Sequence, residues 1–171
     1  MNDYQQLLRK YCQDGDHGAF RTFYRAQATR LWRFLIARGC DRDSAYDLLS
    51  EAFLKFIQSV CKDPSSPVAF LYRIAINLHI DSYRRRQASP IDATVDADDL
   101  EPLAGEAPDD HAHVRRLVQN LPADEQNLLL MRYWVGMTHK ELAQVLDMPE
   151  GSVRRRCAET LKKVRDNWEQ E

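Results

Sequence analysis

The chain has 171 residues, of which 44% are apolar and 29% charged, and this composition is typical of a globular protein with one mid-sized or two small domains. No stretch approaches the roughly 18 apolar residues of a membrane span, and the N-terminus lacks the pattern of a signal peptide. We therefore expect a cytoplasmic protein without membrane contact. The cysteines are scattered, which argues against a zinc site or a disulfide framework and favours buried thiols: Cys12, Cys40, Cys61 and Cys157.

The net charge of −2 conceals an uneven distribution. Residues 1–90 hold fourteen Lys/Arg and nine Asp/Glu, residues 91–113 hold eight acids and no Lys/Arg, and residues 114–171 hold ten bases and nine acids. Two neutral or basic blocks therefore flank one acidic segment. Because local patches decide nucleic-acid binding, the acidic net charge does not exclude it.

The acidic segment at residues 89–110 predicts a flexible linker, since it has three prolines, one glycine and no helical periodicity. We expect an N-terminal domain at 1–88, a linker at 89–112 and a C-terminal domain at 113–171. Periodicity elsewhere is helical, so the predicted fold class is all-α: two small helical domains joined by an acidic flexible linker.

Three helices are expected in the N-terminal block, at 17–38, 42–60 and 68–86, with Asp41 or Asp43 as the N-cap of the second. Spacings of three and four predict their apolar faces. These faces are Phe20, Phe23, Tyr24, Leu31, Phe34 and Leu35 in the first helix, Ala45, Leu48, Leu49, Ala52, Phe53, Phe56 and Ile57 in the second, and Phe70, Leu71, Ile74, Ala75, Leu78 and Tyr83 or Ser82 in the third.

The C-terminal block predicts helices at 114–121 and 122–134, followed by a helix-turn-helix. Thr138 and Glu141 form a capping box at the start of its first helix, which ends near Asp147, where a left-handed conformation is tolerated. Pro149 suits the start of the second helix. The apolar face of this helix is predicted to be Val153, Cys157, Leu161 and Val164, which leaves Arg154, Arg155 and Arg156 exposed on its first turns.

An arginine run on a helix is commonly only a solvated face, and helical hairpins are common. The capping box, the turn length and the position of the arginines in the first turns together favour a DNA-binding helix-turn-helix, whose second helix enters the major groove.

The two blocks together resemble bacterial RNA polymerase sigma factors of the sigma-70 family, extracytoplasmic-function type. The N-terminal block resembles domain 2 of that family through LWRFLIARGCDRDSAYDLLSEAFLKF and FLYRIAINLHIDSYRRR. The C-terminal block resembles domain 4 through LPADEQNLLLMRYWVGMTHKELAQVLDMPEGSVRRRCAETLKKV. The resemblance implies a protein that binds core RNA polymerase and directs it to promoter DNA.

The resemblance also implies site residues. Docking to core polymerase falls on Asp47, Leu48, Glu51 and Phe53. Contacts to the partly single-stranded −10 element fall on Asn77, Asp81, Tyr83, Arg84, Arg85 and Arg86. Contacts to the −35 duplex fall on His139, Lys140, Ser152, Arg154, Arg155 and Arg156. Arginine suits this role because it pairs with guanine or with phosphate.

One departure from the family pattern lies at the start of the docking helix. The family commonly has Asp-Ala-Glu-Asp there, whereas this chain has Ser44-Ala45-Tyr46-Asp47. The missing acids lead to the hypothesis that negative charge at positions 44–51, supplied in part by Glu51 and added by a Ser/Thr kinase, gates polymerase docking. Sequestration by an anti-sigma protein is the commoner control in the family.

Two other classes of protein were weighed. An autonomous helix-turn-helix regulator would account for residues 136–164, but not for the acidic linker or for the basic and aromatic helix before it. An enzyme is disfavoured, because the sequence has no catalytic constellation, no phosphate-binding glycine loop and no His/Cys cluster at metal spacing. We therefore expect no cofactor and no metal.

Overall fold

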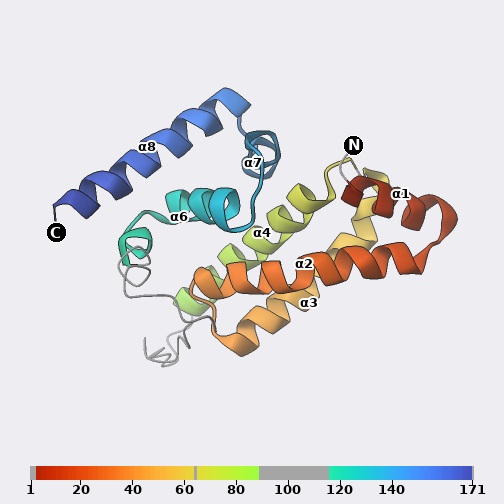
Figure 1. The fold of residues 1–171 in the computed structure, drawn as a ribbon. Helices are drawn as coiled ribbons and strands as arrows, with labels where there is room; N and C mark the ends of the chain where they lie inside the picture. The colour runs from red at the N-terminus through yellow and green to blue at the C-terminus, as the bar shows by residue number, and fades with distance from the viewer. Residues whose placement is uncertain (1–2, 64, 89–115, 171) are drawn as a thin grey trace. The chain divides into compact units, whose positions relative to one another are not determined.

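The computed structural model describes residues 3–63, 65–88 and 116–170, and these residues form helices and no strand. The predicted all-α class is confirmed. The linker predicted at 89–112 lies outside the described residues. The helices fall into two units, which are described separately (Figure 1). None of the helices in the described ranges has the length and hydropathy needed to cross a membrane.

The N-terminal unit consists of four α-helices and a short 3₁₀ turn. They are α1 (Asp3–Asp14), α2 (His17–Ala37), α3 (Arg42–Ser59), η1 (Val60–Lys62) and α4 (Pro67–Ala88). Helix α1 folds back against α2, while α3 packs between α2 and α4 (Figure 1). The bounds predicted for α2, α3 and α4 are correct to within two residues, whereas α1 was not assigned a range from the sequence.

Local hydrogen bonds shape the turn between α2 and α3. Gly39 has a φ of +89°, and the N–H groups of Gly39 and Cys40 donate to the carbonyls of Ile36 and Leu35 at 2.9 and 3.1 Å. This is the Schellman arrangement, which reverses the chain within two residues. Asp41 is the N-cap of α3, because its side chain accepts the N–H of Ser44 at 2.9 Å.

Aromatic side chains dominate the core of the N-terminal unit. Phe56 of α3 stacks on Phe23 of α2 with ring centroids 5.2 Å apart, and it also contacts Phe70 of α4 at 5.8 Å. Phe34 meets the edge of Tyr72, which is fully buried. Burial of these rings is the main favourable contribution to folding of the unit.

The predicted apolar face of α4 is rotated by about one residue from the observed one. The buried positions are Pro67, Val68, Ala69, Leu71, Tyr72, Ala75 and Leu78. Phe70 and Ile74 are half-buried, at the edge of this face, and of the predicted alternatives Tyr83 is 58% exposed and Ser82 half-buried. Both stripes have helical spacing, and the neighbouring helices decide which of them faces inward.

The C-terminal unit contains a helical turn at residues 116–119, α6 (Ala123–Leu129), η3 (Leu130–Trp134), α7 (His139–Leu146) and α8 (Glu150–Glu169). The single helix predicted at 122–134 is an α-helix that widens into a π-helix, with the N–H of Val135 donating to the carbonyl of Leu130 at 3.0 Å. Helix α6 packs against α8.

The inner face of α8 is Val153, Cys157 and Thr160, each at most 3% exposed. Leu161, predicted to be buried, is 41% exposed. At about 100° per residue, position 161 lies roughly 80° around the helix from position 153, whereas position 160 lies within about 20° of it. The prediction was wrong because two successive steps of four residues drift away from the buried face, whereas a step of four followed by a step of three stays on it.

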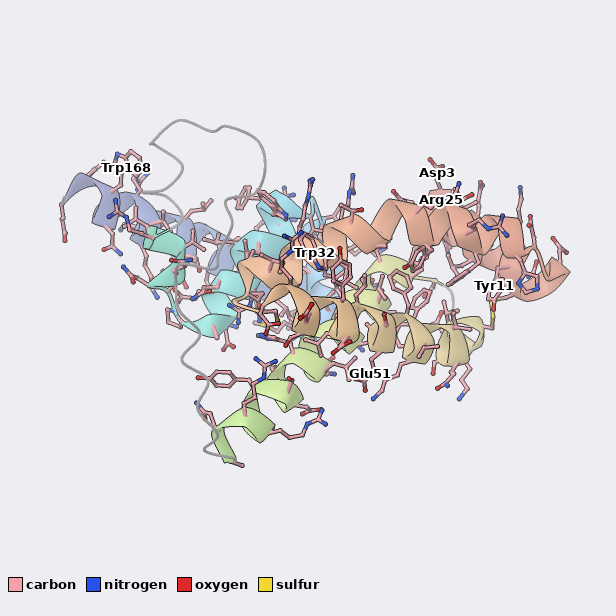
Figure 2. All side chains as sticks on the ribbon, turned by 90° about the horizontal axis from the view of Figure 1, so that it is seen from below. Asp3, Tyr11, Arg25, Trp32, Glu51 and Trp168 are labelled. Atoms are coloured by element: carbon pink, nitrogen blue, oxygen red, sulfur yellow. A yellow bond between two sulfur atoms is a disulfide. The ribbon has the colours of Figure 1, made fainter. Side chains whose placement is uncertain are left out.

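The cysteines form one disulfide, between Cys12 at the end of α1 and Cys61 in η1. In Figure 2 it is the yellow bond near the labelled Tyr11. The prediction of thiols is correct for Cys40 and Cys157, which are buried, and wrong for this pair. The pairing depends on how α1 folds back onto the unit, which cysteine spacing does not reveal.

Candidate nucleic-acid and polymerase interfaces

The helix-turn-helix is built from short-range hydrogen bonds. The Thr138 N–H donates to Glu141 Oε2 at 2.8 Å, and the Glu141 N–H donates to Thr138 Oγ1 at 3.2 Å, so the predicted capping box is confirmed. At the other end of α7, Asp147 has a φ of +51° and the Met148 N–H donates to the carbonyl of Ala143 at 3.0 Å. The turn into α8 is therefore a second Schellman arrangement, with aspartate at the left-handed position.

The three arginines at the start of α8 are exposed, as predicted. Their side-chain contacts with the described residues are all short-range. Arg154 pairs with Glu150 at 3.0 Å and Arg155 with Glu159 at 3.9 Å, both one turn away on the same helix, and Arg156 Nη1 lies 3.4 Å from the Met148 sulfur. Exposed pairs of this kind contribute less than about 1 kcal/mol, so a phosphate or a guanine edge can replace them.

The other residues predicted to meet the −35 duplex lie nearby in the chain. Lys140 is exposed, while His139 and Ser152 are half-buried. His139 and Lys140 open α7, whose N-terminus favours anions such as phosphate. Arg132 in η3 donates to the carbonyl of Met137 at 2.9 Å, which holds the segment leading into α7.

The residues predicted for the −10 element lie on the C-terminal half of α4. All six are exposed: Asn77, Asp81, Tyr83, Arg84, Arg85 and Arg86. Tyr83 accepts a hydrogen bond from Gln87 at 2.8 Å, and Arg85 Nε donates to the carbonyl of Asp81 at 3.3 Å. An exposed ring among cations suits stacking on an unpaired base next to the phosphate backbone.

Arg86 makes contacts that the sequence did not predict. Its Nη2 donates to Ser44 Oγ at 2.6 Å and lies 3.9 Å from Asp41 Oδ2, although these residues belong to the first turn of α3. Ser44 in turn donates to Asp41 at 2.6 Å. Hydrogen bonds from Ser44, with a smaller contribution from Arg86, lower the pKa of Asp41. The end of α4 is thus tied to the start of α3.

The exposed face of α3 carries the carboxylates predicted to dock polymerase. Asp47 and Glu51 are exposed and one turn apart, and Glu51 lies on the outer side of the helix (Figure 2). Lys55, a further turn along, lies 3.7 Å from Glu51 and offsets part of its charge. The row Asp47–Glu51–Lys55 therefore has a net charge of −1, which is weak for an acidic docking face.

Two of the predicted docking residues belong to the core instead. Leu48 and Phe53 are 6% and 4% exposed, so they pack into the core beneath α3 and are not available to a partner protein. The reason is the period of the helix, which turns them toward α2 and α4. The exposed large apolar residues on α3 are Tyr46, Leu54 and Ile57, at 53%, 62% and 36%, so the prediction that Ile57 belongs to the buried face is wrong.

An aromatic pair lies beside this row of charges. The rings of Tyr46 and Trp32 are 5.5 Å apart, and the guanidinium of Arg42 lies 5.9 Å from the centre of the Trp32 ring. Sequence reasoning noted Tyr46 only as a missing acid. The exposure of Tyr46 and its contact with Trp32 indicate that this part of α3 offers a partner an aromatic surface in place of a carboxylate. Among the described residues, no cluster of three or more His, Cys, Asp or Glu side chains could hold a metal ion.

Comparison with protein families matches both units of the chain. Residues 23–89 match the model for Sigma-70 region 2, and residues 112–164 match the model for Sigma-70, region 4. Among curated proteins, the RNA polymerase sigma-H factor of Pseudomonas aeruginosa is 29% identical over 168 residues, covering 89% of this chain and 86% of its own length. The ECF RNA polymerase sigma factor RpoE of Cereibacter sphaeroides is 26% identical over 171 residues, covering 96% and 94%.

Two solved structures share the fold. CnrH, in a complex with the cytosolic domain of CnrY, superposes with a TM-score of 0.74 at 20% identity and covers 99% of both chains. The sigma factor RpoE of Bartonella quintana, in a complex with the anti-sigma factor NepR, has a TM-score of 0.67 at 17% identity and covers 86% of this chain and 94% of its own.

Proposed function

This chain belongs to the sigma-70 family as an extracytoplasmic-function sigma factor that binds core RNA polymerase and directs promoter-specific initiation, and we propose how its residues divide that work. Residues 1–88 dock the polymerase and engage the −10 element, residues 113–171 engage the −35 element, and residues 89–112 link the two. The proposal assigns the protein no reaction of its own and places its action in the cytoplasm, where RNA polymerase works.

The −35 element is proposed to be recognised by α8. The exposed Arg155 and Arg156 lie in its first turns, and the pairs that hold them are weak and local. Such side chains can turn toward guanine edges or phosphates at little cost. Lys140 and His139, at the start of α7, would hold the phosphate backbone on one side and so set the register of the recognition helix.

The −10 element is proposed to lie along the outer face of α4. Asn77, Tyr83 and Arg84 are exposed over two turns of this helix. Amide, ring and guanidinium groups at this spacing suit unstacked bases and the phosphates between them. Arg86 lies next to these residues, but its contacts with Ser44 and Asp41 favour a structural role in addition to DNA binding.

Polymerase docking is proposed to fall on the exposed row of α3, with Asp47 and Glu51 as charged contacts and Tyr46 and Leu54 as apolar ones. A basic partner surface would complement the two carboxylates. Leu48 and Phe53 take no part in this contact, because they are buried.

Negative charge on α3 is proposed to gate docking. Ser50 is exposed beside Glu51, whereas the hydroxyl of Ser44 is engaged by Asp41 and Arg86. A phosphate at Ser50 would add about −1.5 to −2 charge to a face that now carries little. We expect Glu51→Gln to weaken core binding and Ser50→Asp to strengthen it in a pull-down at low salt. Equal binding by both variants and the natural chain would refute the gating.

An anti-sigma protein is proposed as a second partner. Bartonella quintana RpoE was solved with the anti-sigma factor NepR, and CnrH with the cytosolic domain of CnrY. A partner of this kind would compete with polymerase for the exposed face of α3. Competition between such a protein and core polymerase in a binding assay would test the proposal, and simultaneous binding of both would contradict it.

The observation that carries the promoter proposal is the run of exposed arginines in the second turn of α8, which follows the tight turn at Asp147. An autonomous regulator would share that feature, so the experiment must involve polymerase. Purified core RNA polymerase would be mixed with fragmented genomic DNA, and RNA 5′ ends would be mapped with and without this protein. We expect new start sites that share two upstream motifs at a fixed spacing.

The same experiment separates the alternatives. If no start sites depend on the protein but it binds duplex DNA as a dimer, the autonomous regulator is correct. Repeating the reaction with Ser50→Asp separates a sigma factor that needs added charge from a protein that does not bind polymerase at all.

A further inference from the structure

The disulfide between Cys12 and Cys61 is unusual for a protein that works with RNA polymerase. In a reducing compartment, disulfides are usually transient and redox-sensing rather than structural. This bond joins the last turn of α1 to η1, the turn that ends α3, across 49 positions of sequence, with Cα atoms 5.4 Å apart. Neither promoter recognition nor polymerase docking accounts for it.

The inner face of α1 brings Cys12 to this place. Leu8 and Cys12 are one turn apart and therefore share one side of the helix. Leu8 is fully buried, and Val60, the residue before Cys61, is fully buried as well. Packing on both sides thus holds the two sulfur-bearing positions next to each other, so that the pair can close again after it has been reduced.

Noncovalent contacts also hold α1, mainly along α2, with further contacts to α4 and η1. Leu8 is its fully buried residue, Tyr4 meets the edge of Phe23 with centroids 5.8 Å apart, and Tyr11 contacts Phe20 at 5.1 Å. A helix of twelve residues is marginal by itself, since isolated helices below about 12–15 residues are barely stable in water. The covalent bond therefore adds to the packing that attaches α1, and it acts at the end of the helix nearest η1.

The four cysteines differ in their access to solutes. Cys61 is exposed and Cys12 half-buried, whereas Cys40 and Cys157 are 5% and 3% exposed. Burial raises the pKa of Cys40 to about 11 and also raises the pKa of Cys157. Because the thiolate is the reactive form, oxidants act on the exposed pair and leave the two buried thiols unchanged.

We propose that Cys12 and Cys61 form a reversible redox site that fastens α1 to the rest of the N-terminal unit, closed by peroxides and opened by cellular dithiols. One thiolate attacks a peroxide oxygen to give a sulfenic acid and releases hydroxide, which takes up a proton to become water. The second thiol displaces a further water to form the S–S bond. Two thiols thus supply two electrons to one peroxide. A dithiol reverses the step by exchange and is itself oxidised to a disulfide.

Opening the bond changes the unit locally. Helix α1 precedes the residues matched by the region 2 model, so loosening it acts first on its contacts with Phe20 and Phe23. Detachment uncovers the rings of Phe20 and Phe23 on α2. The oxidation state therefore sets how often this end of the core is exposed.

The first test counts thiols in the full-length protein. The chain is reduced, freed of reductant, treated with hydrogen peroxide, denatured and alkylated for mass spectrometry. We expect two of the four thiols to disappear into one cross-linked peptide pair containing positions 12 and 61. Sulfinic acids in place of the cross-link, or four alkylated cysteines, would overturn the proposal.

The second test measures amide hydrogen exchange of α1 in the oxidised and the reduced protein. We expect the α1 amides to exchange about tenfold faster or more after reduction, while those in the middle of α3 stay unchanged. In Cys12→Ser, the α1 amides should exchange as fast as in the reduced protein under both conditions. In the control Cys157→Ala, the difference in α1 exchange between the oxidised and the reduced protein should remain. Equal exchange of α1 in both oxidation states would refute the fastening role. Neither test needs polymerase or a promoter, so its outcome is independent of the proposed function.

Discussion

Two runs of three arginines occur in this chain, and they lie in opposite settings. Arg154–Arg156 lie in the second turn of α8, where their side-chain contacts with the described residues reach no further than eight positions along the chain. Arg84–Arg86 close α4, where Arg86 reaches 42 positions back to Ser44 and also contacts Asp41, the N-cap of α3. The same tripeptide thus makes only short-range contacts in the C-terminal unit, whereas in the N-terminal unit it joins α4 to α3.

The difference teaches how an arginine becomes available to DNA. Cations in the last turn of a helix are favoured by the helix dipole, which stabilises Arg85 and Arg86, whereas Arg154–Arg156 lie beyond the first turn of α8 and gain nothing from its dipole. The pairs of Arg154 with Glu150 and of Arg155 with Glu159 are exposed and contribute little. The run in α8 is therefore the better candidate for contacts made only when DNA is present.

The largest expected effect is on −35 binding. Arg155→Ala and Arg156→Ala should each weaken promoter binding by the polymerase complex by about 1–3 kcal/mol if they contact guanine. If the contact is to phosphate, the slope of log affinity against log salt should fall by about 0.9 per lost contact. Binding titrations over a range of salt concentrations would separate the two contacts.

The matched control for this prediction is Lys162→Ala, which removes an exposed cation further along the same helix. It should leave promoter affinity nearly unchanged. If Lys162→Ala and the arginine variants weaken binding equally, α8 acts only through its overall charge and the recognition role is wrong.

A second effect concerns the cap that Arg86 reaches. Asp41→Ala should lower the free energy of unfolding by about 1 kcal/mol, because it removes the N-cap of α3. Asp43→Ala is the control, since Asp43 lies in the same turn but does not cap it. Urea unfolding at neutral pH would measure both, and equal losses would mean that the cap contributes nothing particular.

The cap also predicts a pH dependence at the acid end. The folded pKa of Asp41 lies below its ordinary value of 3.8, so its stabilisation is fully present above pH 3.8 and is lost as the pH falls through the folded pKa. Unfolding followed from pH 5 downward should show this loss in the natural chain. In Asp41→Asn the corresponding decline should be smaller.

A smaller effect separates Arg86 from its neighbour Arg84. In a double-mutant cycle, Arg86→Ala and Ser44→Ala should show a coupling of up to about 1 kcal/mol in unfolding, as expected of an exposed charged hydrogen bond. Arg84→Ala combined with Ser44→Ala should show none. Coupling of equal size in both cycles would mean that Arg86 has no special link to α3.

The smallest expected effect is a pH dependence of stability from His79, which precedes the arginine run in α4. Burial, with Arg38 and Arg86 nearby, lowers the pKa of this histidine below 6.5. Because the unfolded chain takes up the proton more readily, stability should fall as the pH drops below 6.5, and His79→Gln should reduce that fall. Arg86→Ala should raise the histidine pKa in an NMR titration, and no change would place Arg86 away from it.

Much of the candidate site could be predicted because it rests on local rules. The capping box of Thr138 and Glu141, the left-handed Asp147 and the exposure of the α8 arginines each depend on residues within a few positions. The error at Leu48 and Phe53 came from assigning docking roles along the chain without choosing a side of the helix. Both lie on the apolar stripe that the sequence had already marked as core.

The sequence by itself determined the helices other than α1, the capping box of Thr138 and Glu141, and the helix-turn-helix, and it carried the resemblance of both blocks to one family. The helices and the capping box follow from hydrogen bonds and periodicities that span less than about two helical turns. Only the tertiary structure decided that Tyr72 is fully buried while Phe70 is half-buried, that Arg86 reaches α3, and that Cys12 meets Cys61. Each of these depends on the rotation of one helix against another, which is set by packing between residues far apart in the chain.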